Sequence, residues 1–341
     1  MKRIFFLFLM ASLMGGTAFA QKSDPLASWK PAFDPSKAQY TYLLSNIAHP
    51  VMEGVANGYR IRDAVWERSG GRLYVDFRPL AQLGGEKDVI NKLKMGAVHG
   101  VLLSSVAAAN VAPKLGVVNL PYVVDTYEKL EKFRNNKELF KEYQDSTLSK
   151  GLITADIVNY GQYGWATTTP VRSLAEARKV NFRIAEAPVN VDIYRSWDMK
   201  FTVMPWPDVA QALQTGVING LDHTAIACNI TKKLDIAKYF TELNYAQGLF
   251  IHLINKPWFD RLPADLQKIL MEVIEEESAK TREATRRQHD TQVAAAKANG
   301  VEFIQLSEED RQTLIDLSAP VLKKWGEQIG PEFLDKMRKE L

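Results

Sequence analysis

The sequence contains a single cysteine, Cys228, among its 341 residues. One thiol excludes an intramolecular disulfide and a thiolate metal cluster. The neighbours Ala225, Ile226 and Ala227 are apolar, and no adjacent charge would lower the pKa of the thiol. The pattern therefore fits a small buried side chain better than a reactive nucleophile.

Recognisable catalytic motifs are also missing. The sequence has no Gly-x-Ser-x-Gly elbow, no His-Glu-x-x-His, no phosphate-binding loop and no Cys/His ligand spacing. We therefore expect a protein that is not an enzyme and that holds no cofactor or metal. The adjacent pair Asp222 and His223 is the best acid–base candidate, so a periplasmic enzyme using this pair stays open as an alternative. Neighbouring residues on a chain seldom converge on one proton, which weakens that alternative.

Charge of one sign is not concentrated in any segment, although the formal net charge is +3. Lys2 and Arg3 supply two of these charges. The densest basic run, residues 281–287, is balanced by the glutamates at 275–277 and by Glu283. Because a nucleic-acid interface requires clustered lysine and arginine, we expect no nucleic-acid partner.

Long hydrophobic runs are confined to the N-terminus. Two basic residues precede the apolar residues 4–10, and the small-residue sequence at 17–20 follows. This layout is typical of a secretory signal peptide, so we expect cleavage after Ala20 and a mature chain that begins at Gln21. No cysteine at that point accepts a lipid, and no later stretch approaches the roughly 18 apolar residues of a membrane helix. The sequence predicts a periplasmic protein.

Strand-like and helix-like segments alternate in the first half of the chain. Residues 40–44 and 72–77 have the pattern of strands, and residues 51–69 and 86–95 have helical spacing. Residues 100–105 form an apolar run typical of a strand that is buried on both faces. This alternation predicts an α/β fold with helices on both sides of a sheet.

The pattern begins again at residues 152–158, passes through a predicted loop at 161–165, and continues with a strand around Arg183. A mature chain of about 320 residues exceeds the size at which one core keeps growing, so two lobes are expected. A helical pattern then runs from Pro263 to Gly300, roughly 50 Å at 1.5 Å per residue, and must cross both lobes. The expected boundaries are residues 21–158 and 247–287 for lobe 1, and 159–246 and 288–341 for lobe 2.

The clearest candidate site is built around Arg183. This lone arginine lies in the strand-like segment 180–184, and Trp206 and a short glycine-ended helix follow it. Arginine presents a planar charged fork that meets a carboxylate or sulfonate with two parallel hydrogen bonds. Because a buried guanidinium without a counter-charge is costly, Arg183 either pairs with Glu186 or Asp222 or awaits an anionic ligand. The arrangement predicts ligand binding and not catalysis.

Seven motifs, together with the signal peptide, resemble in their order the substrate-binding protein of tripartite ATP-independent periplasmic (TRAP) transporters, the DctP family. The motifs are residues 82–86, 93–96, 120–123, 181–183, 205–208, 212–220 and 262–267. The resemblance implies a two-lobe periplasmic binding protein fold, with crossing hinge strands and a long C-terminal helix spanning both lobes. It also implies that the lobes close over an organic anion held by Arg183.

The partners implied by this resemblance are the small and large membrane subunits of an ion-driven permease. We expect the protein itself to be a monomer. An exported module that hands its ligand to a sensor kinase is the alternative, and the neighbouring genes would distinguish the two.

Three positions depart from the pattern of many relatives. Tyr163 stands where many of them carry a second arginine, which favours a ligand with one negative charge. His223 stands where an asparagine often contacts the ligand; it either binds the ligand, helped by partial protonation, or is structural. Ser104 lies where a carboxylate is common, and the apparent absence of an acid there weakens the case for an amino group on the ligand.

The remaining candidates lie at strand ends or on aromatic positions. Asn46 and His49 follow the first strand, at the edge where open α/β sheets place ligands. Trp206 forms a ligand wall or closes the core, and the same two roles stay open for Tyr163 and Trp165. The expected ligand is a small monoanion, either a hydroxy- or oxo-carboxylate or a small sulfonate of the isethionate type.

Overall fold

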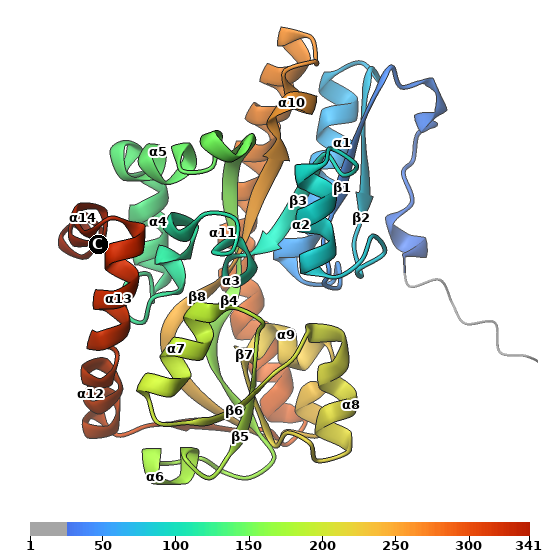
Figure 1. Cartoon of the computed structure of the whole chain (residues 1–341). Helices are drawn as coiled ribbons and strands as arrows, with labels where there is room; N and C mark the ends of the chain where they lie inside the picture. Colours follow the sequence, from blue (N-terminus) through green and yellow to red (C-terminus); the bar gives the residue numbers. More distant parts are fainter. Residues whose placement is uncertain (1–25) are drawn as a thin grey trace, which may run out of the picture. The chain divides into compact units, whose positions relative to one another are not determined.

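The computed structural model describes residues 26–341 (Figure 1). The predicted signal peptide, with cleavage after Ala20, lies outside these residues. The described residues fall into two units, residues 26–34 and residues 35–341. In the first, the described part contains the 3-10 helix η1 (Ala27–Trp29). The second contains the sheet and the site described below.

A mixed sheet organises residues 35–341, with the strand order β2-β1-β3-β8-β4-β7-β5-β6 and with β9 paired to β8. Its strands are β1 (Tyr40–Ser45), β2 (Leu73–Arg78), β3 (Gly100–Ser104), β4 (Leu152–Thr167), β5 (Asn181–Ile184), β6 (Lys200–Val203), β7 (Gly220–Thr224), β8 (Tyr239–Asn255) and β9 (Glu302–Gln305). β1 pairs in parallel with β2 and β3, and β5 pairs in parallel with β6 and β7. The predicted α/β class is confirmed.

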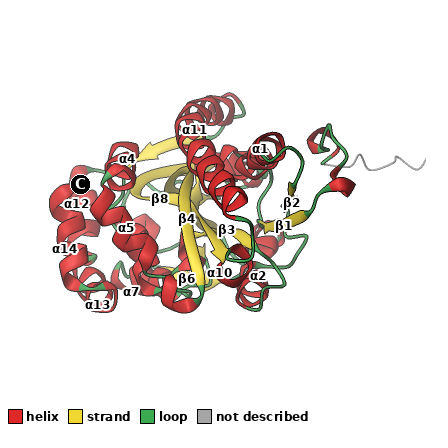
Figure 2. Cartoon of the chain, turned by 90° about the horizontal axis from the view of Figure 1, so that it is seen from above, coloured by secondary structure: helices red, strands yellow, loops and turns green. Residues whose placement is uncertain are grey.

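Helices cover this sheet on both sides, and α1 and α2 lie on opposite sides of β1 and β2 (Figure 2). The helices of the first half are α1 (Glu53–Arg68), α2 (Glu86–Lys94), α3 (Ser105–Ala108), α4 (Tyr127–Asn135), α5 (Lys137–Asp145), α6 (Leu174–Ala177) and α7 (Pro188–Ser196). Those of the second half are α8 (Val209–Gln214), α9 (Ala225–Ile230), α10 (Lys256–Phe259), α11 (Ala264–Ala298), α12 (Glu308–Leu317), α13 (Ala319–Ile329) and α14 (Pro331–Glu340). Short 3-10 helices include η3 (Pro113–Asn119), η5 (Trp206–Asp208) and η6 (Lys233–Asp235).

Two long strands join the two halves of the sheet. β4 and β8 have 16 and 17 residues and run antiparallel to each other. One end of β8 pairs with β3, through Phe250–Ile254, and one end of β4 pairs with β7, through Tyr163–Thr167. These crossing strands therefore connect the β1–β3 group to the β5–β7 group, as expected for the two-lobe fold.

The predicted loop at residues 161–165 is wrong, because β4 continues through it. Gly161 and Gly164 suggested a break in the strand. Gly164, together with Gly248 on β8, instead permits a close approach of the crossing strands. A Cβ at Gly164 would lie 2.5 Å from the Thr241 carbonyl oxygen, and one at Gly248 would lie 2.4 Å from the Tyr160 ring. Register shifts between Asn159 and Gly164 absorb the local bend instead.

The helix α11 has 35 residues and follows the predicted range closely. It packs against α1, against β4 and against α9, so it contacts elements from both halves of the sheet. The C-terminal helices also cross the expected lobe boundaries, since α13 packs against both η3 and α7 and α14 packs against α5.

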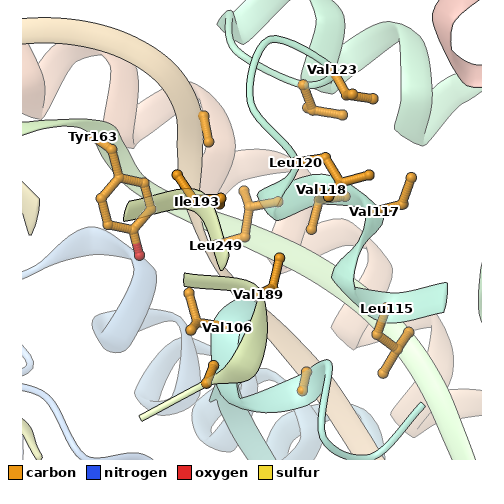
Figure 3. Close-up of a cluster of buried hydrophobic side chains, with 14 of the residues drawn as sticks. Val106, Leu115, Val117, Val118, Leu120, Val123, Tyr163, Val189, Ile193 and Leu249 are labelled. Carbon is orange, nitrogen blue, oxygen red and sulfur yellow. The ribbon is translucent and has the colours of Figure 1, made fainter. Parts of the chain in front are cut away.

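A core of aliphatic side chains supports one wall of the site. Figure 3 shows Tyr163 beside a cluster that includes Val106, Val189, Ile193 and Leu249. These side chains come from α3, β4, α7 and β8, which lie far apart in the sequence. Tyr163 is thus held by the core on one side.

Cys228 is fully buried in α9, and burial raises the pKa of its thiol to about 12. The interpretation of a small buried side chain is confirmed, because a thiol with that pKa carries almost no thiolate at neutral pH. Over residues 26–341, no helix combines the length and the apolar character needed to cross a membrane. The same range holds no group of three or more His, Cys, Asp or Glu side chains placed to bind a metal ion.

Candidate ligand-binding site

A cavity lies near the carboxyl ends of β3, β5 and β7, where an open α/β sheet places its ligand. It contains about 590 Å³ of space that no atom fills, part of which is open solvent. A wider outer hollow shares Glu86, Arg183 and Trp206 with it, so the cavity continues outward to the surface. We call the inner space the cleft cavity.

Arg183 lies on one wall of the cleft cavity, and only 4% of the residue is exposed. The strand places it between Phe182 and Ile184, which are fully buried. Its Nε donates to the Met204 carbonyl oxygen at 3.0 Å, which orients the guanidinium. Burial lowers the pKa of Arg183, but a guanidinium remains charged at any physiological pH.

The terminal nitrogens of Arg183 make no ion pair with any described residue. Glu186 and Asp222, the two alternatives considered from the sequence, both lie beyond the 4.0 Å limit of an ion pair, and Glu186 is exposed. A buried cation without a paired carboxylate strongly favours an anionic ligand.

The Trp206 ring contacts two cationic side chains and a histidine. The Arg183 guanidinium lies 5.6 Å from the centre of the indole, and the Lys233 ammonium lies 4.0 Å from it. The His223 ring is 4.3 Å away, centre to centre. Trp206 is half-buried and lines the cleft cavity. It therefore holds the cations by cation–π contacts and also forms part of the wall.

Lys233 is a buried cation that the sequence analysis missed. It is 5% exposed, its Nζ donates to the Thr231 hydroxyl at 3.3 Å, and no carboxylate of the described chain lies within 4.0 Å of it. Burial lowers the pKa of its ammonium. Nothing in the sequence around Lys232 and Lys233 distinguishes these residues from solvent-exposed lysines after a helix end, so only the fold identifies Lys233.

His223 lines the cleft cavity in its neutral form. Its Nδ1 accepts from the Thr224 backbone N–H at 2.9 Å, so in neutral imidazole the proton lies on Nε2. Burial lowers the pKa of His223 well below its usual value, and the charges of Arg183 and Lys233 act in the same direction. The expected partial protonation is therefore wrong, and His223 is a neutral hydrogen-bond donor.

Two carboxyl groups also line the cleft cavity. Asp222 is 3% exposed, accepts from the Tyr245 hydroxyl at 2.7 Å through Oδ2, and leaves Oδ1 without a partner in the described chain. Burial raises the pKa of Asp222 to about 7, although Tyr245 and Arg183 oppose the shift. Asp222 and His223 form no hydrogen bond with each other; Asp222 bonds to Tyr245 and His223 to the Thr224 N–H.

The second carboxyl group corrects the sequence analysis. No acid was expected near Ser104, but Glu86 Oε1 accepts from the Ser104 backbone N–H at 2.9 Å. Glu86 begins α2, 18 residues earlier in the chain, and the fold brings it to the end of β3. The motif that contains Glu86 was recognised, but its spacing gave no indication of which strand end the side chain would reach.

Of the expected site residues, five line the cleft cavity together: Ser104, Tyr163, Arg183, Trp206 and His223. The Ser104 hydroxyl also accepts from the Ala107 backbone N–H at 3.2 Å and so caps α3. The Tyr163 hydroxyl bonds to that of Tyr160 at 2.8 Å. Tyr163 thus belongs both to the core and to the cavity wall.

The other three expected residues do not line the cleft cavity, and each has local partners. Asn46 donates to the Leu102 carbonyl oxygen at 2.7 Å and accepts from the Ala48 N–H at 2.6 Å. His49 accepts from the Val51 N–H at 3.2 Å. These groups stabilise the loop after β1, whose residues Ile47 and Ala48 form the actual lining.

Trp165 is fully buried, and its indole N–H donates to the Tyr194 hydroxyl at 2.8 Å. Its ring contacts Phe182 and Trp197 in the core. Of the two roles left open for Trp165, the structure shows this side chain in the core.

The sequence profile of the family described as bacterial extracellular solute-binding protein, family 7 (DctP), matches residues 49–328. The chain belongs to this family. DctP-family proteins are the solute-binding proteins of TRAP transporters, which bind small organic acids and work with membrane permease components.

A curated DctP relative is the C4-dicarboxylate-binding periplasmic protein of Rhodobacter capsulatus, 25% identical over 330 residues that cover 96% of both chains. Two solved structures share the fold. A TRAP periplasmic solute-binding protein from Shewanella oneidensis, with bound succinate, has a TM-score of 0.83 and 19% identity and covers 89% of this chain and 99% of its own. The sugar acid binding protein DctPAm of Advenella mimigardefordensis, in complex with galactonate, has a TM-score of 0.82 and 21% identity. The match covers 89% of this chain and 98% of the DctPAm chain.

Proposed function

We propose that this protein is the periplasmic solute-binding component of a TRAP transporter that captures a small organic monoanion. The ligand is a hydroxy- or oxo-monocarboxylate or a small sulfonate of the isethionate type. The protein acts as a monomer and delivers this ligand to the small and large membrane subunits of the permease. The observation that carries the proposal is the buried Arg183, which lines the cleft cavity and has no ion-pair partner in the described chain.

The charges around the cleft cavity support one negative charge on the ligand. Arg183 and Lys233 are the two buried cations, while Glu86 and Asp222 are the two acids. Asp222, with a pKa of about 7, is close to half-protonated at neutral pH. Tyr163 supplies no charge at the position where many relatives have arginine. The two acids offset part of the charge of the two cations, which leaves little attraction for a dianion.

The first prediction concerns ligand charge and is checked by titrating succinate, lactate and isethionate side by side in a calorimeter. We expect lactate or isethionate to bind more tightly than succinate, because a second carboxylate of succinate would meet the carboxyl groups of Glu86 and Asp222, which line the cleft cavity, whereas Lys233 does not line it. Succinate binding tightest by more than about tenfold, or 1.4 kcal/mol, would overturn the monoanion proposal. It would leave Lys233 as the natural partner of the second carboxylate.

Ligand binding is proposed to close the two lobes, with residues 21–158 and 247–287 in lobe 1 and residues 159–246 and 288–341 in lobe 2. The register shifts between Asn159 and Gly164 place irregular backbone at the lobe boundary in β4, where Gly161 has a φ of +114°. Irregular positions of this kind absorb the backbone rotation of a hinge. Glu86 and Ser104 come from lobe 1 and Arg183 from lobe 2, so a ligand that contacts both draws the lobes together.

Small-angle scattering checks this closure. The radius of gyration is expected to fall when saturating ligand is added, and the Arg183→Ala variant, which does not bind, serves as the control that shows no change. A radius that stays constant at saturation in the wild-type protein would indicate a rigid cavity and would contradict closure.

A further inference from the structure

We propose that Lys233 is a positioning residue that holds the indole of Trp206 in place as a wall of the cleft cavity. Lys233 does not line the cavity itself, so its effect on binding passes through Trp206. The inference rests on the proposed function for one of its readouts, the affinity for an organic anion. A second readout, the motion of the Trp206 ring, needs no ligand.

The ammonium of Lys233 lies in the layer behind the cavity wall. Its Nζ is 4.0 Å from the centre of the Trp206 ring and donates to the Thr231 hydroxyl at 3.3 Å. Trp206 and Thr231 both line the cleft cavity, whereas Lys233 lines neither this cavity nor the outer hollow. Lys233 therefore contacts two wall residues without being exposed to a ligand.

The orientation of the Trp206 side chain depends on contacts of its ring. Its indole N–H donates to no residue of the described chain, whereas those of Trp165 and Trp197 each donate to a hydroxyl group. The ring is half-buried and packs against an apolar cluster formed in part by α8 and α9. Because apolar packing is not directional, the polar contacts of the ring decide which way the indole faces.

Lys233 is the most durable of these polar contacts. Measured to the centre of the Trp206 ring, the Lys233 ammonium lies at 4.0 Å, the His223 ring at 4.3 Å and the Arg183 guanidinium at 5.6 Å. His223 and Arg183 line the cleft cavity, so both are free to change partners when a ligand binds. Lys233 is outside the reach of the ligand and keeps its contact with the indole in both states.

A lysine at this position destabilises the fold. The residue is 5% exposed, and no carboxylate of the described chain pairs with its ammonium. Burying an unpaired charge costs free energy that a methionine of similar length would avoid. The ammonium gains the negative face of the indole, an attraction that is stronger away from water than at the surface. The buried cation is therefore explained by its hold on Trp206 and not by a gain in stability.

The backbone directs Lys233 inward. Lys232 has a φ of +61°, a left-handed conformation that is uncommon for residues with a side chain, and η6 begins at the next residue. Leu234 and Ala237 are buried and anchor this segment in the core. As a result, Lys232 is exposed while Lys233 is buried, so the two adjacent lysines form a matched pair for experiments.

Trp206 borders two spaces, because it lines both the cleft cavity and the outer hollow. An indole without support has room to turn toward the outer hollow, and the cavity then lacks part of its wall. By holding the ring in place before the ligand arrives, Lys233 removes an ordering cost from binding. Loss of the ammonium is therefore expected to weaken binding, although no contact with the ligand is lost.

The first measurement follows the Trp206 ring in the ligand-free, full mature protein. With 5-fluorotryptophan incorporated, each tryptophan gives a fluorine NMR resonance, and Trp206→Leu identifies the one that belongs to Trp206. We expect the transverse relaxation rate of this resonance to change in Lys233→Met, because the ring gains motion, and to stay the same in Lys232→Met. A rate in Lys233→Met that equals the wild-type rate would overturn the inference.

The second measurement is calorimetry with the tightest-binding member of an acid panel that consists of lactate, isethionate and succinate. We expect Lys233→Met to bind this acid about tenfold more weakly, whereas the Tm of the ligand-free protein stays the same or rises. Lys233→Gln keeps a donor for the Thr231 hydroxyl and is expected to lose as much affinity, which separates the ring contact from that hydrogen bond. Wild-type affinity in Lys233→Met, or a loss of folding in both variants, would contradict the positioning role.

A double-mutant cycle with Trp206→Leu tests whether Lys233 acts through the indole. In the Trp206→Leu background, the loss caused by Lys233→Met is expected to shrink from about tenfold to about twofold or less, because no ring is left to position. Lys232→Met is expected to leave the affinity unchanged in both backgrounds. An equal loss in both backgrounds would show that the ammonium attracts the anion directly, and the inference would be wrong while the proposed function stands. If the wild-type protein binds no acid of the panel, the proposed function fails, and the relaxation measurement decides the inference by itself.

Discussion

Arg183→Ala is expected to abolish binding of organic anions while the protein stays folded. The substitution removes the charge-assisted hydrogen bonds to the acid group and leaves the bound anion desolvated without a partner. Truncation of one partner in a buried charge pair costs about 2–5 kcal/mol or more, which corresponds to a loss of roughly 30-fold to several thousand-fold in affinity. Calorimetry with the best ligand of the acid panel measures the loss.

The folded state tolerates this change for a physical reason. The only side-chain hydrogen bond that Arg183 makes in the described chain is from Nε to the Met204 carbonyl oxygen. Removing an unpaired buried cation also removes its desolvation cost, so the melting temperature of the ligand-free protein is expected to stay the same or to rise. Circular dichroism and thermal melts supply this control.

Arg183→Lys tests the geometry of the fork separately from its charge. An ammonium is a point charge and does not reproduce two parallel hydrogen bonds, so we expect poor rescue of affinity. Native-like affinity in Arg183→Ala would show that the anion binds elsewhere and would overturn the assignment.

Ligand affinity is expected to fall as the pH rises through about 7, and Asp222 is the cause. Burial raises the pKa of this carboxyl group to about 7, so it is mostly neutral below that pH and mostly ionised above it. An ionised Asp222 lies in the same cavity as the anionic ligand and repels it, so binding is coupled to retention of the proton. The affinity therefore decreases at higher pH, by at most about tenfold for each pH unit.

A variant of Asp222 is needed to separate its effect from those of the other titratable groups of the cavity. The pKa of His223 is well below its usual range, so this side chain is neutral throughout. Arg183 and Lys233 are cations whose pKa values are lowered by burial, and the pKa of Glu86 is raised. Calorimetry between about pH 6 and 8.5 with a sulfonate measures the dependence, because a sulfonate does not itself titrate in this range.

Asp222→Asn is the control for the pH dependence. Asparagine keeps an acceptor for the Tyr245 hydroxyl but has no proton to lose, so the slope is expected to flatten and the affinity at high pH to exceed that of the wild-type protein. An unchanged slope in Asp222→Asn would assign the dependence to another group.

The fold was predictable from the sequence where local patterns decide it. The strands β1, β2 and β3 and the helix α11 lie close to the residues that periodicity indicated. The crossing strand β4 was predicted too short, because the glycines at 161 and 164 are usually strand breakers. In this fold, the close packing of β4 and β8 instead requires glycine at positions 164 and 248. The sequence alone does not indicate that these two strands pack closely.

The candidate site was predictable only in part, for a similar reason. Arg183 and Trp206 belong to short motifs whose order in the chain indicates a binding region, and His223 follows the motif at residues 212–220. Glu86 and Lys233 enter the cleft cavity or its border from α2 and η6, and charged residues at such helix ends are solvent-exposed in most proteins. Their position at the cavity depends on how distant elements pack.

Strand-end residues show the opposite kind of error. Ligands lie at the carboxyl ends of strands, and this rule correctly predicted that the loop after β1 lines the cavity. The Asn46 side chain, however, forms hydrogen bonds with the backbone of Leu102 and Ala48. Trp165 is two residues from Tyr163 on β4, yet Tyr194 of α7 covers it. The sequence indicates which loop faces the cavity. Local hydrogen bonds then determine which side chains of that loop are free to bind a ligand.

A crystal structure of the protein with the tightest-binding acid of the panel tests the central claim most directly. The account predicts that the carboxylate or sulfonate of the ligand lies within hydrogen-bond distance of both terminal nitrogens of Arg183, in the cleft cavity. A ligand bound outside this cavity, or an Arg183 that pairs with Glu186 or Asp222 while the acid group contacts other residues, would contradict it.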